Sequence, residues 1–290
     1  MQIHPTPLTF RPGTTADAAV CGTICYDAFK AIAEQHNFPP DFPSTDIAIS
    51  LLSMILMHQN VYSIVAEVDG RVVGSNFLWE GDTIAAVGPI TVAPAVQNVS
   101  LGRQLMERVL ERAHRRRHVG IRLVQAAYHN RSLSMYTKLE FQAREPLTVL
   151  QGPPLSLDLP GYPVRKATVD DLAHCDELCR HVHGHDRHGE VRQAIADGTA
   201  TVVEHGRKIT GYATNIGHFA HAVGTTNEDL KALIGAAPSF LGPGFLLPTR
   251  NFELFSWCLA QGLRVVQPMT LMSRGLYQKP AGAFLPSVLY

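Results

Sequence analysis

The chain has 290 residues, 46% of them apolar and 17% charged, and its 25 Lys and Arg residues balance 25 Asp and Glu residues. This composition excludes a disordered chain and allows a core large enough for two domains. The balanced charge provides no net field that would attract nucleic acid or an anionic membrane, so we expect neither partner.

Two further features bear on the cellular compartment. The N-terminal stretch MQIHPTPLTFRPG lacks the basic and apolar regions of a signal peptide, and no apolar run approaches the roughly 18 residues of a membrane helix. The five cysteines are odd in number, in a chain too large to need disulfide bonds. We therefore expect a cytoplasmic protein with reduced thiols.

The first half predicts strands and helices in a regular order. Strands are predicted over Leu8–Arg11, Tyr62–Val68, Arg71–Trp79, Thr83–Val92, Ile121–Ala127 and Arg144–Leu150, and helices over Ala16–Gln35, Thr45–Gln59, Ser100–Arg117 and Ser132–Leu139. Asp69-Gly70, between two alternating runs, is typical of a hairpin turn. This order predicts an α/β (α+β) fold in which a mixed, mostly antiparallel sheet is flanked by helices.

The second half repeats the first. FRPGTTADA, which starts at Phe10, aligns with VRKATVDDL, which starts at Val164, and EVDGRVVG matches EHGRKITG further along. A repeat of this length indicates a duplicated domain rather than a solenoid. The proline-rich stretch QGPPLSLDLPGYP is typical of a linker. We therefore predict a first domain over residues 1–150, a linker over 151–163 and a second domain over 164–290.

Cysteine and histidine spacing raises the question of a metal. Cys21 and Cys25, and likewise Cys175 and Cys179, would share one helix face, which suits either a metal site or small apolar side chains in the core. The run HVHGHDRHGE could ligate a transition metal or form a solvated loop between two helices. Because neither group has a partner cluster at a diagnostic spacing, we favour the core and the loop and expect no metal.

One turn is a candidate anion site. The apolar run IAAVGPITV leads into VAPAVQNVSLGRQ and then into the helical pattern LMERVLERAHRRR. A helix N-terminus offers unpaired N–H groups and the positive end of its dipole to a phosphate, provided that small residues let the backbone come close. Ser100 and Gly102 are such residues. Taken alone, the stretch fits an ordinary strand-to-helix turn at least as well.

A second stretch changes this balance. HNRSLSMYTKLEF, from His129 to Phe141, places a tyrosine late in a short helix and an aromatic residue at the start of the next strand. Together the two stretches resemble the GCN5-related N-acetyltransferase (GNAT) superfamily, in a tandem form with a degenerate second domain. The resemblance covers residues 8–150 in the order of their elements.

The resemblance implies a site for acetyl-CoA. The loop amides would hold the pyrophosphate, the preceding strand would pair with the pantetheine arm, and Tyr136 would protonate the departing thiolate. The implied cofactor-binding residues are Thr91, Val92, Gln97, Asn98, Val99, Ser100, Leu101, Gly102, Arg103, Gln104, Asn130, Ser132 and Tyr136.

Three residues of the first domain depart from the family pattern. Ser100 stands where members usually have Gly, and we expect an ordinary φ for it. Glu140 replaces a Gly before the closing aromatic residue, and His129 replaces an Asn. These departures leave acyl-CoA binding in place but bear on thiolate protonation and on the orientation of the tyrosine helix.

The second domain departs further. Cys258 stands at the position of the tyrosine, and the turn TTNED carries acidic residues that would repel a pyrophosphate, so we predict that this domain has lost its cofactor site. The run GHFAHAVGTT is predicted as a strand that carries His218 and His221. These histidines are either satisfied polar contacts or, if one lines a cleft between the domains, a candidate base.

Acyl transfer also calls for a base near the attacking amine. Glu80, at the end of a predicted strand, is the first candidate, although Glu80-Gly81-Asp82 also fits a plain polar turn. His129 is the second candidate, because an imidazole titrates near neutral pH.

The resemblance thus implies an acyl-CoA-dependent N-acyltransferase that moves an acetyl group from acetyl-CoA to a small-molecule or peptide amine by direct attack. The alternative is a protein that binds acyl-CoA or senses a ligand without turnover. We expect a monomer or a homodimer.

Overall fold

The computed structural model describes residues 8–97 and 100–289, which divide into two compact units. The first unit comprises residues up to 81 together with 85–121, and the second comprises 82–84 and 122 onward. Among the described residues, no helix is long and apolar enough to cross a membrane.

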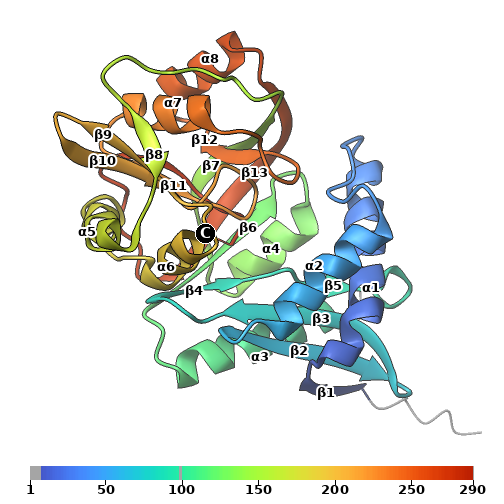
Figure 1. Ribbon diagram of the computed structural model, residues 1–290. Coiled ribbons are helices and arrows are strands. Elements are labelled where there is room, and N and C mark those ends of the chain that lie inside the picture. The colour runs from blue at the N-terminus through green and yellow to red at the C-terminus, as the bar shows by residue number, and fades with distance from the viewer. Residues whose placement is uncertain (1–7, 98–99, 290) are drawn as a thin grey trace, which may run out of the picture. The chain divides into compact units, whose positions relative to one another are not determined.

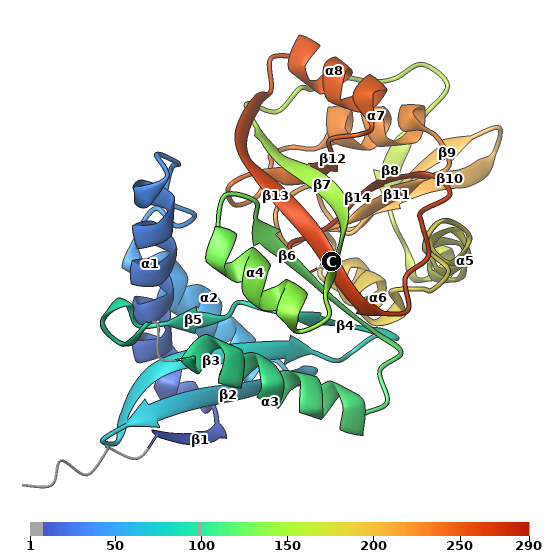
Figure 2. The same cartoon turned by 180° about the vertical axis from the view of Figure 1, so that it is seen from behind.

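The first unit is built on an antiparallel sheet. Its strands are β1 (Leu8–Pro12), β2 (Val61–Val68) and β3 (Arg71–Trp79), and both β4 (Ile84–Val87) and β5 (Thr91–Val92) pair with β3. Its helices are α1 (Ala18–Gln35), α2 (Thr45–Met57) and α3 (Leu101–Arg115), with short 3₁₀ turns at Thr15–Asp17 and Pro94–Val96. Helices α1 and α2 cover one face of the sheet and α3 covers the other (Figures 1 and 2).

The alternation of side chains along β3 explains this layering. Phe77 is fully buried with Cys21 and Leu52, which come from α1 and α2. Asn76 points to the opposite face, where its amide donates to the backbone carbonyl of Leu105 on α3 at 3.3 Å. Successive strand residues face opposite sides of a sheet, so β3 supplies both cores.

The second unit contains two groups of strands. One has the order β6 (Gly120–Ala126), β13 (Arg264–Gly275), β7 (Gln142–Gln151) and β12 (Phe245–Pro248). The other has the order β14 (Ala283–Leu285), β11 (Ala222–Gly224), β10 (Lys208–Ala213), β9 (Thr201–His205) and β8 (Val164–Lys166). The helices are α4 (Asn130–Lys138), α5 (Leu172–His183), α6 (His188–Ala196), α7 (Asn227–Ala236) and α8 (Phe252–Ala260), with a 3₁₀ turn at Val169–Asp171.

The internal repeat is visible in matched ion pairs. Arg11 donates to Asp17 at 2.8 Å and to Glu67 at 2.9 Å. In the second copy Arg165 donates to Asp171 and to Glu204, both at 2.7 Å. The same arginine ties the first strand to the next turn and to the hairpin in both copies, which confirms the duplication read from the sequence.

The two copies exchange their last strands within the second unit. Strand β6 of the first copy lies beside β13 of the second, and β12 of the second lies beside β7 of the first (Figure 2). Matching hydrogen bonds mark the exchange: Ala127 N–H donates to Pro268 at 3.0 Å, and Thr249 N–H donates to Pro146 at 2.9 Å. The contact boundary therefore falls at residue 121, whereas the repeat itself places the joint at residues 151–163.

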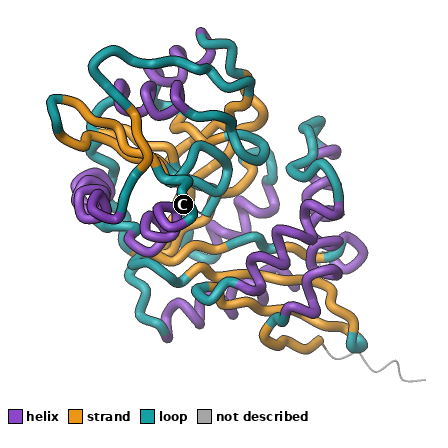
Figure 3. The backbone as a smooth tube through the Cα atoms, viewed as in Figure 1, coloured by secondary structure: helices purple, strands orange, loops and turns teal. Residues whose placement is uncertain are grey.

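The joint between the copies has no helix or strand of its own over residues 152–163 (Figure 3). Leu155, Leu159 and Tyr162 nevertheless pack against the core of the second unit. The cysteines are free and fully buried in hydrophobic cores, which confirms the core interpretation of the two cysteine pairs.

Two strand predictions are wrong. The single strand expected over Thr83–Val92 is interrupted after Val87, because the Gly88-Pro89 step lacks an N–H for the ladder. The strand expected over GHFAHAVGTT is reduced to β11, with His218 in a turn before it. The turn is held by His218 N–H, which donates to the carbonyl of Leu241 at 3.0 Å.

Candidate functional site

The turn between β5 and α3 is tied to the strand that precedes it. The side-chain amide of Gln97 donates to the backbone carbonyl of Val92 at 3.2 Å. Thr91 is buried, and its hydroxyl lies 3.3 Å from that of Ser75 on β3. A Cβ at Gly74 would lie 2.8 Å from the carbonyl oxygen of Thr91, so this glycine lets β3 and β5 approach. Of the predicted loop residues, Asn98 and Val99 lie outside the described residues.

Ser100 enters α3 in the left-handed conformation, with φ 62° and ψ 12°. The expectation of an ordinary φ at this serine is therefore wrong. At the start of α3, Ser100 adopts the backbone that a glycine would take at no steric cost. A non-glycine residue in this region costs about 1–2 kcal/mol.

The first turn of α3 offers its amides without an acidic side chain nearby in the sequence. Leu101, Gly102, Arg103 and Gln104 contain no acid, and within the described residues the Ser100 side chain makes no capping bond. The N–H groups at the start of a helix have no intrahelical acceptor, so this end can receive an anion. The guanidinium of Arg103 pairs with Glu107 one turn on, at 2.8 Å.

The matching helix of the second copy has filled the same position with its own carboxylate. Asp229 is 1% exposed and accepts from the N–H of Thr226 at 2.8 Å and from the hydroxyl of Thr210 at 2.5 Å. This capping box satisfies the start of α7 and puts a negative charge where a phosphate would have to bind. Helices α3 and α7 thus begin with opposite electrostatic character.

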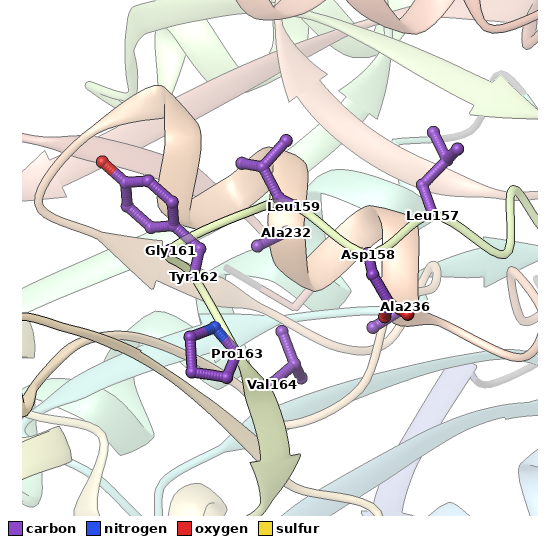
Figure 4. A pocket seen from close by; sticks show the side chains of 9 residues that line it. All are labelled: Leu157, Asp158, Leu159, Gly161, Tyr162, Pro163, Val164, Ala232 and Ala236. Atoms are coloured by element: carbon purple, nitrogen blue, oxygen red, sulfur yellow. The ribbon is translucent and has the colours of Figure 1, made fainter.

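A surface pocket of about 270 Å³ lies along α7, away from that helix start (Figure 4). Its walls are the joint between the copies and two alanines of the helix, and they comprise Leu157, Asp158, Leu159, Gly161, Tyr162, Pro163, Val164, Ala232 and Ala236. No basic side chain is among these nine residues, and Asp158 would repel an anion. The pocket is therefore unsuited to a phosphate group.

Tyr136 lies on α4, in the second unit, with 6% of its surface exposed. Its hydroxyl is hydrogen-bonded to Ser132, and its ring meets Phe141 edge-on with centroids 6.1 Å apart. Burial raises the pKa of Tyr136 well above its ordinary range, because the phenolate would be desolvated. The phenol therefore stays protonated and can act as a donor.

Glu140 and His129, the two departures from the family pattern around α4, have the same backbone conformation as Gly262 and Asn251 at the matching positions of the second copy. Glu140 follows α4 with φ 69°, and Gly262 follows α8 at the matching position with φ 85°. His129 begins α4 as Asn251 begins α8. Asn130, the first residue of α4, is exposed, and Ser132 is half-buried.

Glu80 is held in an ion pair within the first unit. Its two carboxylate oxygens accept from Nη2 and Nε of Arg112 at 2.6 and 2.9 Å. The guanidinium also lies over the ring of Tyr62, 5.0 Å from its centroid. The hydrogen bonds from Arg112 lower the pKa of Glu80, which makes this carboxylate a weaker base than a free one.

A buried polar network surrounds His221 in the second unit, in keeping with the satisfied polar contact that is one of the two predictions for this residue. His221 lies between the hydroxyl of Tyr212 and the carboxylate of Glu190, at 2.9 Å from each. Arg187 pairs with Glu190 at 2.5 Å, and Asp82 accepts from the N–H of Gly189 at 2.9 Å. The run HVHGHDRHGE does form a turn between α5 and α6, as expected, but His183 and His185 are buried rather than solvated.

Burial shifts the pKa values of the groups in and near that network. Desolvation lowers the pKa of His221, and outside the network it lowers the pKa of the buried His218 to about 4. Burial also raises the pKa of Asp82. The network joins β10, α6 and the segment before β11 with internal partners, which is typical of a polar core.

Comparison with known proteins identifies a family match in the first half of the chain. Residues 26–141 match a family model described as acetyltransferase (GNAT) family. No curated protein matches the chain significantly.

Three solved structures resemble nearly the whole chain. A candidate acetyltransferase from Pyrococcus horikoshii is 17% identical, with a TM-score of 0.73 over 98% of this chain and 95% of that one. A GCN5-related N-acetyltransferase from Sphaerobacter thermophilus is 14% identical, with a TM-score of 0.62 over 94% and 96%. A tandem GNAT protein from the clavulanic acid biosynthesis pathway is 15% identical, with a TM-score of 0.55 over 97% and 100%. These likenesses confirm the predicted fold of two GNAT-like domains in tandem.

Proposed function

We propose that the chain is an acyl-CoA-dependent N-acyltransferase, and the match of residues 26–141 to the GNAT acetyltransferase family supports this. It transfers the acetyl group of acetyl-CoA to an amine of a small molecule or a peptide. The first copy binds the acyl-CoA, and the second copy has no such site.

The start of α3 carries this proposal. Its amides follow a left-handed Ser100 and a first turn without acidic residues, whereas the start of α7 is closed by Asp229. An anion such as the pyrophosphate of acetyl-CoA is stabilised by the first and repelled by the second. The start of α7 therefore serves as an internal comparison for the start of α3 within the same fold.

The reaction we propose is direct attack. The amine nitrogen bonds to the thioester carbonyl carbon, the C–S bond breaks with its electron pair on sulfur, and Tyr136 gives its proton to the thiolate. The surplus proton on the nitrogen leaves to water, and the phenol is then reprotonated. Because burial disfavours the phenolate, Tyr136 returns readily to its protonated form. We give Glu80 no part in this step, since its carboxylate is engaged by Arg112.

Calorimetric titration with acetyl-CoA tests the binding half of the proposal. Gly102→Val places a branched side chain on the second residue of α3 and should weaken binding at least tenfold by blocking backbone approach. Gly102→Ala, which adds one methyl group, is the graded control and should change affinity less than threefold. Equal affinities in all three proteins would contradict the placement of the pyrophosphate.

Thiol release over a panel of amines tests the catalytic half. Tyr136→Phe should lower kcat about 100-fold, within the range for loss of a general acid, without changing acetyl-CoA affinity. Binding without thiol release from any amine would instead support a ligand sensor. If acetyl-CoA does not bind, both functions are wrong.

A further inference from the structure

His129 caps the helix that carries Tyr136. Its Nδ1 accepts a hydrogen bond from the backbone N–H of Ser132 at 3.4 Å. The N–H of Leu133 donates to the carbonyl of His129 at 3.1 Å as the first bond of α4. A side chain that accepts from the first helical turn satisfies an N–H group that has no other helical partner.

The second copy makes the same cap with a side chain that does not titrate. Asn251 begins α8 with φ −77° and ψ 71°, against φ −84° and ψ 78° at His129. Its Oδ1 accepts from the N–H of Leu254, also at 3.4 Å. Because Oδ1 is an acceptor only, the match indicates that the imidazole nitrogen is an acceptor as well.

This contact assigns the tautomer of His129. A nitrogen that accepts a hydrogen bond carries no proton, so the neutral ring holds its proton on Nε2. In this form Nδ1 is engaged in the cap and Nε2 has no lone pair to offer. His129 therefore cannot take a proton from an amine without giving up the cap.

Ser132 connects the cap to the phenol. Its N–H donates to His129, and its side chain is hydrogen-bonded to Tyr136 one turn further along α4. At the matching positions of the second copy the sequence has Leu254 and Cys258, so that copy has a hydroxyl at neither position. The hydrogen bond from the Ser132 side chain is therefore present only in the copy that has the tyrosine.

We propose that neutral His129 is a positioning residue for Tyr136. It holds the first turn of α4, and through Ser132 it holds the phenol in the orientation that thiolate protonation requires. This inference rests on the proposed acyl transfer, and it moves His129 from the role of base to that of an acceptor that fixes the acid.

Protonation of His129 would remove this support. The imidazolium has two N–H donors and no acceptor, so its Nδ1–H would face the N–H of Ser132 at the positive end of the helix dipole.

Several charged and polar side chains lie on α4 or on the segments next to it. Arg131 and Lys138 lie on α4, and Tyr128 lies in the preceding turn. Strand β13 presents the neutral amide of Gln267, which accepts from Tyr128 at 3.0 Å, and the carbonyl of Pro268, which accepts from Ala127 N–H. Among these groups His129 is the one imidazole, the side chain that ordinarily titrates between pH 5 and 8.

The test compares His129→Asn with His129→Ala by thiol release from acetyl-CoA between pH 5.5 and 8.5. At pH 8 we expect His129→Asn to keep at least half of the wild-type kcat. His129→Ala should lose about fivefold, which corresponds to the roughly 1 kcal/mol of a typical N-cap. Towards acid pH the activity of the wild type should fall relative to that of His129→Asn. The ratio of the two proteins at each pH cancels the titration of the acceptor amine.

A matched control comes from the second copy. Asn251→Ala removes the same cap from α8 and should leave kcat and its pH profile unchanged. If His129→Asn is as impaired as His129→Ala at pH 8, or if the ratio of wild-type to His129→Asn activity does not change with pH, the proposal is wrong and His129 takes part in proton transfer.

A readout independent of turnover completes the test. In the ¹⁵N NMR spectrum, the His129 resonances, assigned by their loss in His129→Asn, should show an unprotonated Nδ1 and a protonated Nε2. A proton on Nδ1 would overturn the proposal whether or not the protein transfers acetyl groups. Absence of thiol release from the wild type would overturn the proposed function alone, because the NMR result still reports on the cap.

Discussion

Replacing Glu80 by Gln distinguishes an ion-pair role from a role as general base. The carboxylate is 11% exposed and the Arg112 side chain is 31% exposed, with the shorter of two hydrogen bonds at 2.6 Å. These contacts join the end of β3 to the last turns of α3. Glu80→Gln keeps one acceptor for Arg112 but turns an NH₂ group towards the guanidinium.

The expected magnitude follows from the contact. A hydrogen bond to a charged group contributes about 1.5–3 kcal/mol, and partial exposure of Arg112 reduces the contribution. We therefore expect Glu80→Gln to lower the free energy of unfolding by about 1–2 kcal/mol at pH 7. A general base would behave differently, because its removal lowers kcat by about 10²–10⁴-fold.

The pH dependence has a defined sign. Because the Arg112 hydrogen bonds lower the pKa of Glu80 in the folded state, the ion pair stabilises the fold fully above the ordinary glutamate pKa of about 4.3. That contribution is lost as the pH falls through the lowered folded pKa. The stability difference between the wild type and Glu80→Gln should therefore shrink as the pH is lowered from 7 towards about 3.

Urea unfolding at several pH values and thiol release at pH 8 measure the two quantities. Glu107→Gln is the matched control, because Glu107 pairs with Arg103 on the same helix at 2.8 Å but both side chains are about half exposed. Its cost should stay below about 0.5 kcal/mol. A loss of kcat above 100-fold in Glu80→Gln, with stability unchanged, would refute the ion-pair role and restore Glu80 as the base.

Three further predictions concern the fold. Gly22→Ala should destabilise the protein by about 1–3 kcal/mol in urea unfolding, since its Cβ would lie 2.5 Å from the backbone Cα of Ile49; unchanged stability would show that α1 and α2 can separate there. Asp17→Asn should cost about 1 kcal/mol at pH 7, because the Arg11 hydrogen bond lowers the pKa of Asp17 to about 2; the difference should fade between pH 4 and pH 2, and a constant difference would exclude the ion pair as its source. Asp229→Ala should cost about 1–2 kcal/mol through loss of the α7 cap, with acetyl-CoA affinity unchanged by calorimetry; a change in affinity would place a ligand at the second copy.

Local pattern was sufficient for most elements of the fold. Strand β3 (Arg71–Trp79) has its predicted bounds, and α1 and α2 differ from their predictions by two residues at most. The hydrophobic periods of helices and strands are local properties, so they can be read from one segment at a time. The strand predicted over Thr83–Val92 was wrong because a favourable composition outweighed a single proline.

Long-range pairing was beyond the reach of local pattern. The exchange of β7 and β13 joins segments more than 100 residues apart, and either copy alone gives no sign of which partner its last strand will take. The sequence predicts a polar turn or a catalytic role for Glu80, but its partner in the structure is Arg112, 32 residues further on. Such contacts depend on which faces meet after folding, a property that spacing within one element does not contain.

The sequence by itself determined the duplication, because two distant segments share one pattern of residues. It also determined the strand β5, the helix α3 and the tyrosine late in α4, because each of these is a pattern of neighbouring residues. Tertiary structure decided three other matters: that Ser100 adopts a left-handed backbone, that Asp229 closes the start of α7, and that the His129 ring caps α4. In each case a short polar side chain or a backbone angle is set by the groups that surround it. The residue type limits what such a position can do, and the packing around it selects which of those possibilities occurs.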